Sequence, residues 1–278
     1  MNASSLLVTS DLNLSASSEG LIVSLAQKMA SHSPSAVVIA GNLGESVGDL
    51  RTVLTLFKKN LACPLAFVPG NQDLFFQENL SSHDLWTHGL RQEVETLGVK
   101  YLQGSTLELQ GAVVTGTIGW YDYSTALAEM QRTQEYWIQC KLENNVPDAL
   151  RIDWEWSDPE FATLVSRSLE ATLDSLEADP LTREVVVVSH FPVFEWQLPT
   201  LITGRQGEDF QRILRAYQGN LNLGQEILQR SKVTGVVSAH VGIQGHKAIH
   251  RANGGPVNSY LTGSTPTHPS FVEIPLGR

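Results

Sequence analysis

The sequence predicts an α/β fold in a single domain that spans residues 1–278. Short, fully apolar, β-branched runs alternate with longer segments of helical periodicity, which is typical of a sheet whose faces are covered by helices. Polar and ionisable residues directly follow several of these runs. Ligand-binding residues in open α/β sheets gather beyond the carboxyl ends of the strands, so we expect a functional site at that edge.

The first part of the chain predicts three strand–helix pairs. Residues 6–10 are the first expected strand, and a helix over 18–31 follows because Leu21, Leu25 and Met29 recur at helical spacing. The run Ala-Val-Val-Ile-Ala at 36–40 is apolar throughout, as in a strand that is covered on both faces. The next expected elements are a helix at 48–60, a strand at 65–68 and a helix at 85–97 that stops at Gly98.

The rest of the chain predicts more strands and an irregular insertion. Residues 121–157 are rich in Trp, Tyr and Gln with weak periodicity, so we interpret them as an insertion or cap that borders the site and contains a helix near 125–139. Before it, strands are expected at 99–102, 107–109 and 112–115, passing into an antiparallel part. After it, we expect a helix at 159–178, a strand at 183–189, helices at 210–217 and 224–231, and strands at 233–238, 242–249, 259–262 and 271–274.

Composition narrows the class of partner. The 278 residues are 42% hydrophobic and 17% charged, as in ordinary soluble globular proteins. The net charge of −10 argues against a nucleic-acid partner, because such binders usually carry a basic face. The stretch Leu6-Leu7-Val8 lacks a basic flank and is too short for a signal peptide or a membrane span, so we expect no membrane association and a cytoplasmic location. Cys63 and Cys140 lie far apart and do not support a disulfide framework.

Six short polar blocks carry the functional information. They are Ser10-Asp11-Leu12-Asn13, Gly41-Asn42, Gly70-Asn71-Gln72-Asp73, Ser189-His190, Ala239-His240-Val241-Gly242 and Gly263-Ser264. Each begins where an apolar strand is expected to end. One polar strand end would prove little, since a lone Asp is often a helix cap or a turn former. Polar residues at five separate strand ends are hard to explain by packing.

In order and context, these blocks resemble the motifs of the calcineurin-like metallophosphoesterase superfamily. Those motifs are D-x-H, G-D, G-N-H-[DE], a lone His after an apolar strand, and G-H-x-H, with a Gly-Ser turn near the end. The resemblance covers residues 6–274, and the segment Gly-Thr-Ile-Gly-Trp-Tyr-Asp-Tyr at 116–123 also looks like bacterial members. It implies a four-layer α/β/β/α fold, a β-sandwich flanked by helices. It also implies two divalent metals bridged by the aspartate of G-D.

Several charged ligands of the family pattern are neutral here. The metal ligands that the resemblance implies fall on Asp11, Asn42, Asn71, His190 and His240, while Asn13 and Gly242 stand where ligand histidines are lost. The bridging acid has become Asn42, which could still offer a carbonyl oxygen. Of the two implied metal positions, the first keeps only Asp11 unchanged. The second keeps Asn71, His190 and His240, so it is the better candidate for any metal that remains.

The implied catalytic pair is also altered. In the family the histidine of G-N-H-[DE] protonates the leaving group and the following acid orients it. Gln72 replaces that histidine and cannot deliver a proton near neutral pH, which leaves the general-acid partner Asp73 orphaned. General acid catalysis contributes about 10²–10⁴-fold to a rate. Ordinary two-metal hydrolysis is therefore expected to be reduced or lost.

The expected function is that of a calcineurin-like phosphoesterase-superfamily protein. If it is active, it performs metal-dependent hydrolysis of a phosphomonoester or phosphodiester at a degraded centre. One Zn²⁺, Mn²⁺ or Fe²⁺ ion suits the imidazole and amide ligands, and a metal-free protein is the alternative. Two further readings stay open: a catalytically silent relative that binds a small phosphorylated ligand, or an interaction protein that contacts a protein partner through its Trp-rich segment. The sequence does not determine the substrate or the oligomeric state.

Some residues admit two interpretations. His246 or His250 could reach back to replace the histidine missing at Gly242. Asp122 and its aromatic neighbours Trp120, Tyr121 and Tyr123 either line a substrate pocket or pack in the core.

Overall fold

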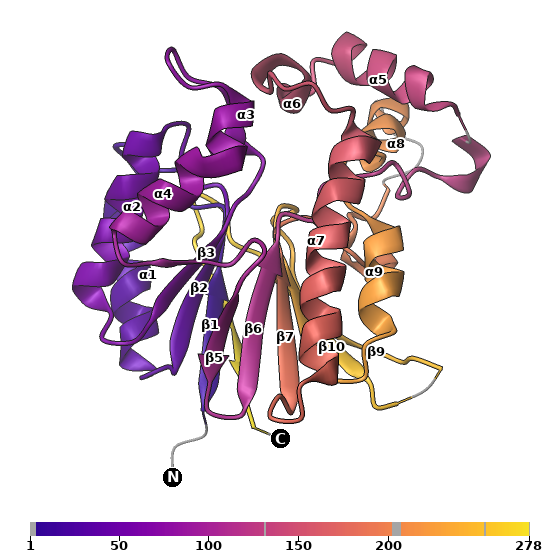
Figure 1. Cartoon of the computed structure of the whole chain (residues 1–278). Coiled ribbons are helices and arrows are strands. Elements are labelled where there is room, and N and C mark those ends of the chain that lie inside the picture. Colours follow the sequence, from indigo (N-terminus) through magenta and orange to yellow (C-terminus); the bar gives the residue numbers. More distant parts are fainter. Residues whose placement is uncertain (1–3, 131, 202–206, 253, 278) are drawn as a thin grey trace.

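The computed structural model describes residues 4–130, 132–201, 207–252 and 254–277. Two sheets pack against each other, and helices cover the outer face of each (Figure 1). This arrangement confirms the four-layer α/β/β/α fold expected from the sequence.

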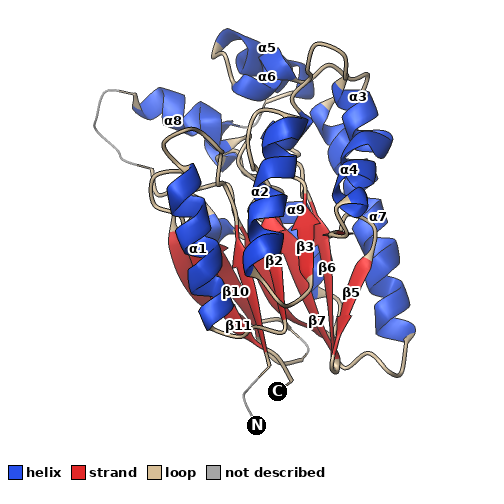
Figure 2. Ribbon diagram, turned by 90° about the vertical axis from the view of Figure 1, so that its left-hand side faces the viewer, coloured by secondary structure: helices blue, strands red, loops and turns tan. Residues whose placement is uncertain are grey.

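The first sheet has the strand order β11-β1-β2-β3-β4. Strands β1 to β4 are parallel, and β11 pairs antiparallel with β1. Helices α1, α2 and α4 lie over its outer face (Figure 2). The bounds are β1 (Ser5–Thr9), α1 (Glu19–Ser31), β2 (Ala36–Ala40), α2 (Val47–Asn60), β3 (Leu65–Val68), α3 (Ser82–Asp84), a π-helical turn (Leu85–Gly89), α4 (Leu90–Thr96), β4 (Lys100–Tyr101) and β11 (Phe271–Pro275).

The second sheet has the order β5-β6-β7-β8-β10-β9. Its four central strands are parallel and both edge strands, β5 and β9, are antiparallel to their neighbours. Helices α7 and α9 cover its outer face (Figure 1). The bounds are β5 (Thr106–Leu109), β6 (Ala112–Thr117), α7 (Asp158–Ala178), β7 (Glu184–Ser189), α9 (Leu221–Leu228), β8 (Val233–Ser238), β9 (Gln244–Ile249) and β10 (Val257–Thr262).

Alternation along the strands explains why the runs are apolar throughout. Val38 packs between the two sheets, whereas Val37 and Ile39 on either side of it pack under the helices of the first sheet. In the second sheet Val186 faces the other sheet and Val187 faces the α7 layer. Side chains of a strand alternate between its two faces, so a strand buried on both needs apolar residues at every position.

The insertion forms a cap at the end of the molecule where the parallel strands end. It contains a 3₁₀ turn (Ala128–Met130), α5 (Gln134–Glu143) and α6 (Pro147–Arg151), and α8 (Glu208–Arg215) lies beside it (Figure 1). A helix was expected near 125–139. Within the described residues it starts later and ends later, and α6 was not predicted. Residue 131 of the expected helix lies outside the described residues.

Two further details differ from the expectations. Residues 100–101 form a parallel edge of the first sheet, so the antiparallel part begins only with β5 and β6. On α1 the side chain of Leu21 is 41% exposed, and the buried face is instead formed by Ile22, Leu25, Ala26 and Met29. Leucine spacing gives the helix correctly but not its phase, because small residues such as Ala26 also belong to the packed face.

No helix in the described ranges is both long and apolar enough to cross a membrane. Residues 4 and 276 pair through the N–H of Leu276 and the carbonyl of Ser4, at the end of the molecule opposite the cap (Figure 1).

Candidate metal-binding site

The predicted ligands meet where the carboxyl ends of the two sheets adjoin. Asp11, Asn42 and Asn71 lie in the loops after β1, β2 and β3 of the first sheet. His190 and His240 follow β7 and β8 of the second. One ligand atom each of Asp11, His190 and His240 lies within 4.8 Å of the other two. Neighbouring parallel strands end at the same edge, which is why residues distant in sequence converge here.

The backbone of these loops adopts left-handed conformations. The φ angle is 51° at Asp11, 37° at Asn13, 59° at Asn42 and 70° at His240. These make up four of the seven non-glycine residues with positive φ in the described part of the chain. Such angles are uncommon outside glycine and cluster at functional sites. The loops therefore keep the backbone shape of a site even where its charged side chains are replaced.

Two glycines allow the loops to approach each other. A Cβ atom at Gly41 would lie 2.4 Å from the backbone nitrogen of Gly70 and 2.7 Å from Nδ1 of His190. A Cβ atom at Gly70 would lie 2.4 Å from Oδ1 of Asn42. Real Cβ atoms do not come so close to other heavy atoms. The glycine of each block is therefore required by the packing of the site itself.

The Asn42 amide is oriented by its neighbours. Its Oδ1 accepts the backbone N–H of Gln72 at 3.0 Å. Its Nδ2 donates to Oδ1 of Asp11 at 3.0 Å and to Oδ1 of Asn71 at 3.3 Å. The reverse orientation would place the amide oxygen against two other oxygens. At the bridging position the chain thus presents N–H donors, and the carbonyl ligand considered from the sequence is turned away.

A residue of the cap fixes the amide of Asn71. Its Nδ2 donates to Oδ1 of Asp148, in α6, at 2.7 Å, which leaves Oδ1 facing the site. The other oxygen of Asp148 accepts the hydroxyl of Tyr121 at 3.0 Å. Burial raises the pKa of Asp148, while Lys141, Asn71 and Tyr121 oppose that rise.

His190 is held as a metal-ligating histidine is held. It is fully buried, and its Nδ1 lies 2.7 Å from the backbone carbonyl of Ala40. A carbonyl can only accept, so Nδ1 carries a proton, and in the tautomer that has this proton alone Nε2 presents a lone pair. That Nε2 is 3.2 Å from Oδ1 of Asn71, which is also an acceptor. A cation or a proton between them would remove the repulsion. A backbone carbonyl that fixes the tautomer is the usual support of a metal-bound imidazole.

Two buried polar atoms of the site have no hydrogen-bond partner: Nδ1 of His240 and Oδ1 of Asn13. Buried polar groups are nearly always paired, so each such atom needs an explanation, and one explanation is an ion site. Burial, reinforced by the nearby His190, lowers the pKa of His240 to about 3. The ring is therefore neutral at physiological pH, which is the form that binds metals.

The ligand atoms of this site fit one divalent cation. The Asp11 carboxylate, the amide oxygen of Asn71 and the imidazoles of His190 and His240 converge as acceptors, and this mixture of N and O ligands suits Zn²⁺, Mn²⁺ or Fe²⁺. A dinuclear centre needs an anionic bridge between its metals, and the bridging position offers the NH₂ group of Asn42 instead.

Asp73 has a structural role in this arrangement. Its carboxylate accepts the backbone N–H groups of Asn42 at 2.7 Å, Gly70 at 2.8 Å and Leu43 at 3.0 Å. Burial raises the pKa of Asp73 against the effect of these donors. The residue called orphaned from the sequence is thus fully engaged, and it ties the Asn42 loop to the Asn71 loop. Gln72 contributes its backbone N–H to Asn42.

The aromatic residues of the cap pack inward. Trp154 lies 4.1 Å from Phe161 and 5.3 Å from Trp120 between ring centroids, and Trp137 is buried. Beneath them Lys141 forms a buried ion pair with Asp158 at 2.8 Å. The cap is therefore a packed unit with a polar centre, in which Trp137 is buried and Trp154 and Trp156 are half-buried.

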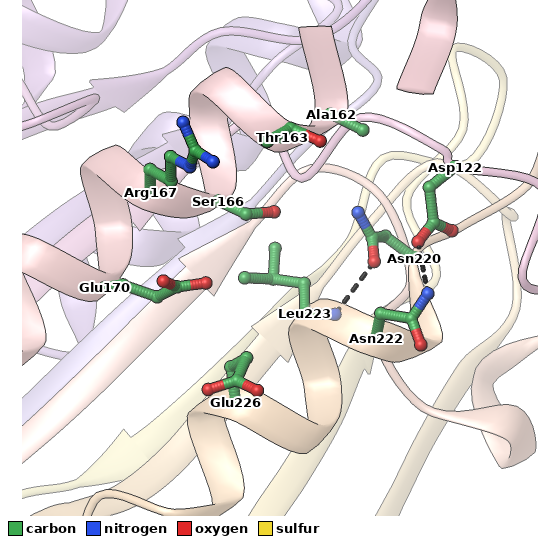
Figure 3. A pocket seen from close by; sticks show the side chains of 10 residues that line it. All are labelled: Asp122, Ala162, Thr163, Ser166, Arg167, Glu170, Asn220, Asn222, Leu223 and Glu226. Carbon is green, nitrogen blue, oxygen red and sulfur yellow. Dashed lines mark hydrogen bonds between the residues drawn. The ribbon is translucent and has the colours of Figure 1, made fainter. Parts of the chain in front are cut away.

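A hollow of about 260 Å³ lies between α7 and α9, apart from the ligand cluster (Figure 3). Asp122 lies at its rim and accepts a hydrogen bond from Asn222 at 2.8 Å. Trp120 and Tyr121 are fully buried. Core packing therefore holds for Trp120 and Tyr121, whereas Asp122 borders this hollow.

His246 and His250, the candidates to replace the histidine missing at Gly242, lie outside the site. His246, on the edge strand β9, stacks on Tyr260 at 4.5 Å and is 3.3 Å from Oδ1 of Asn258. Neither His246 nor His250 belongs to the ligand cluster found among the described residues. The position of Gly242 therefore stays without a histidine.

Sequence reasoning missed Asp148. It follows Pro147 at the start of a five-residue helix, where an acid is common for reasons of helix capping alone. Its contact with Asn71 spans 77 positions of the chain, and no motif marks it.

Comparison with known proteins supports the fold. No family model and no curated protein matches the sequence. Phosphopantetheinyl hydrolase from Mycobacterium tuberculosis is similar in structure, with a TM-score of 0.69 and 18% identity over 97% of this chain and 96% of that one. A dimetal phosphatase from Danio rerio gives a TM-score of 0.59 and 13% identity over 99% and 93%. A purple acid phosphatase from yellow lupin (Lupinus luteus) gives 0.50 and 9% identity over 100% of this chain and 46% of that one. The chain therefore has the fold of the calcineurin-like metallophosphoesterases, as its motifs predict.

Proposed function

We propose that this protein binds one divalent cation and, beside it, a small phosphorylated ligand, and that hydrolysis by a two-metal mechanism is lost. One observation carries the proposal. The lone pairs of His190 Nε2 and Asn71 Oδ1 face each other at 3.2 Å, with the Asp11 carboxylate and the His240 ring beside them. A cation at the centre of such a convergence of acceptors would stabilise it.

The ligand class follows from what a single cation would supply, which is positive charge that attracts a phosphate group. The chain's own residues set the rest. Asn42 gives its N–H groups to Asp11 and Asn71 in place of a bridging acid, and Gln72 offers no proton for a leaving group near neutral pH. Asp73 is committed to three backbone N–H groups. These features weaken the case for turnover.

The deciding experiment measures the metal and the turnover together. Protein purified without chelator is analysed for bound metal, titrated with Mn²⁺ and Zn²⁺ by calorimetry, and assayed with p-nitrophenyl phosphate, its bis-ester and a phosphopantetheinyl ester. We expect about one cation per chain and negligible hydrolysis. His190→Ala should abolish binding because the ring supplies a ligand nitrogen. His246→Ala is the control, since that exposed histidine lies outside the cluster.

The outcomes separate the alternatives. If hydrolytic activity rises in proportion to the bound metal and is abolished in His190→Ala, the protein is a one-metal hydrolase. Protein that binds no cation at any tested concentration would defeat the proposal and leave the metal-free reading.

A further inference from the structure

We propose that Asp148 is a positioning residue: it turns the amide oxygen of Asn71 toward the cation, so that the cap and the cation site order as one unit. The inference rests on the proposed function, because it concerns the same cation. It goes further in assigning a role to the cap.

The Asn71 amide has two possible orientations. In the observed orientation Nδ2 donates to Asp148 and Oδ1 lies 3.2 Å from Nε2 of His190. The reverse orientation would let the amide donate to that lone pair of His190 and would present N–H groups where a cation needs an oxygen. The hydrogen bond from Nδ2 of Asn42 to Oδ1 of Asn71, at 3.3 Å, also favours the observed orientation, and the contact with Asp148 is the shorter of the two, at 2.7 Å. The carboxylate is therefore the main contact that selects the orientation able to bind a cation.

Asp148 is itself held in place by its neighbours. The hydroxyl of Tyr121 donates to its second oxygen, and Nζ of Lys141 lies 5.0 Å from the centroid of the Tyr121 ring. The residue is 5% exposed, so both partners act in a dry environment where charge-assisted hydrogen bonds are strong. One oxygen of the carboxylate is thus held by Tyr121, while the other accepts the hydrogen bond from Asn71.

Helix α6 and the residues after it also dock on the loop that carries Asn71. The backbone N–H of Phe76 donates to the carbonyl of Arg151 at 2.9 Å, and the guanidinium of Arg151 lies over the ring of Phe75 at 4.9 Å. The N–H of Ser82 donates to Oδ1 of Asp153 at 2.6 Å. With the Asp148 contact, these interactions join the cap to residues 71–82. Displacement of the cap would release the Asn71 amide.

The test uses a series at position 148. Asp148→Ala removes the acceptor, and we expect Mn²⁺ to bind about 10–100-fold more weakly by calorimetry, the usual effect of losing a supporting residue behind a metal ligand. Asp148→Asn can still accept from Asn71 through its amide oxygen while its NH₂ group donates to the Tyr121 hydroxyl, so its affinity should stay within a few-fold of wild type. A general loss of stability would lower the melting temperature without this difference between the two variants.

A matched control removes a negative charge from the same segment. Asp153→Asn keeps an oxygen that can accept the N–H of Ser82 and does not touch Asn71, so its Mn²⁺ affinity should equal that of wild type. If Asp148→Ala does not fold, Tyr121→Phe replaces it, since that change loosens Asp148 without removing it. A several-fold loss of Mn²⁺ affinity in Tyr121→Phe is then expected, and an unchanged affinity would contradict the proposal.

A second readout follows the cap directly. Mn²⁺ should slow amide hydrogen exchange in α6 of the wild type and of Asp148→Asn but not of Asp148→Ala. Wild-type affinity and wild-type protection in Asp148→Ala would overturn the positioning role while leaving the cation site intact. A wild type that binds no Mn²⁺ would instead defeat the proposed function, and this inference with it.

Discussion

At the scale of single residues, Asn42 decides what the site can hold. Its NH₂ group donates to Asp11 and Asn71 and so holds two electronegative ligand atoms close together, as a bound cation would. A metal-free site with Asn42 is therefore stabilised from within, whereas an acid at this position would add a second buried negative charge near Asp11.

We predict that Asn42→Asp lowers the stability of the metal-free protein and raises its affinity for Mn²⁺. The loss of hydrogen bonds to a buried charged group costs about 1.5–3 kcal/mol, and repulsion from Asp11 adds to it. Melting temperatures in EDTA and in Mn²⁺ measure both effects. The double variant Asn42→Asp with Gln72→His tests whether the scaffold accepts the bridging acid together with the general-acid histidine. Unchanged metal content in both variants would mean that the cleft cannot reform a centre.

At this scale the sequence predicted which residues converge but not how they face. Asp11, Asn71, His190 and His240 were predicted from block order, and they meet because parallel strand ends share an edge. The direction of the Asn42 amide and the task of Asp73 depend on backbone N–H groups, which no side-chain pattern encodes. Asp148 could not be found because helix capping gives an equally good account of an acid there.

At the scale of elements, the loop after β2 is fitted closely to its neighbours. We predict that Gly41→Ala destabilises the protein far more than Gly111→Ala. Both glycines have similar φ angles, 81° and 86°, but a Cβ at Gly111 meets nothing within 4 Å. The left-handed angle costs roughly 1–2 kcal/mol in each case, and the clash at Gly41 adds about 1–3 kcal/mol. Chemical denaturation of the two variants measures the difference, and equal losses would show that the clash is relieved at no cost.

Helices α2 and α4 offer a test of pH dependence. Hydrogen bonds from Arg51 to both carboxylate oxygens of Glu93, each 2.6 Å, lower the pKa of Glu93. Because the folded pKa is below the unfolded one, this stabilisation is present above the unfolded pKa and is lost as the pH falls through the folded pKa. Glu93→Gln should therefore lower the melting temperature at neutral pH and have no effect in strong acid. Glu95→Gln, in the exposed pair with Arg91, is the control.

Strong periodicity made most elements predictable, and weak periodicity limited the rest. The strands at 36–40 and 183–189 were predicted almost to the residue because burial on both faces leaves them only apolar choices. In the cap, α5 and α6 are short and their contacts are aromatic and polar, so the sequence shows no regular hydrophobic spacing that predicts their bounds. Tertiary contacts determine such helices more than local preference does.

At the scale of the whole molecule, the two sheets hold complementary parts of the site. The first sheet supplies Asp11, Asn42 and Asn71, the second supplies His190 and His240, and the cap supplies Asp148. The α/β class was predictable because apolar strands alternate with helices, and polar strand ends predicted a site at one edge of the sheet. The four-layer arrangement, which brings residues of two sheets together, was implied only by the family resemblance.

That meeting has a consequence for the kinetics of unfolding. Ligands from opposite ends of the chain come together only after both sheets have docked, so a bound cation should stabilise the native state and not the transition state for folding. At a cation concentration 100 times the dissociation constant, the unfolding rate should fall about 100-fold while the folding rate stays constant. Stopped-flow measurements with Mn²⁺ and with EDTA test this. Faster folding in Mn²⁺ would instead show that the strand ends are already together in the transition state.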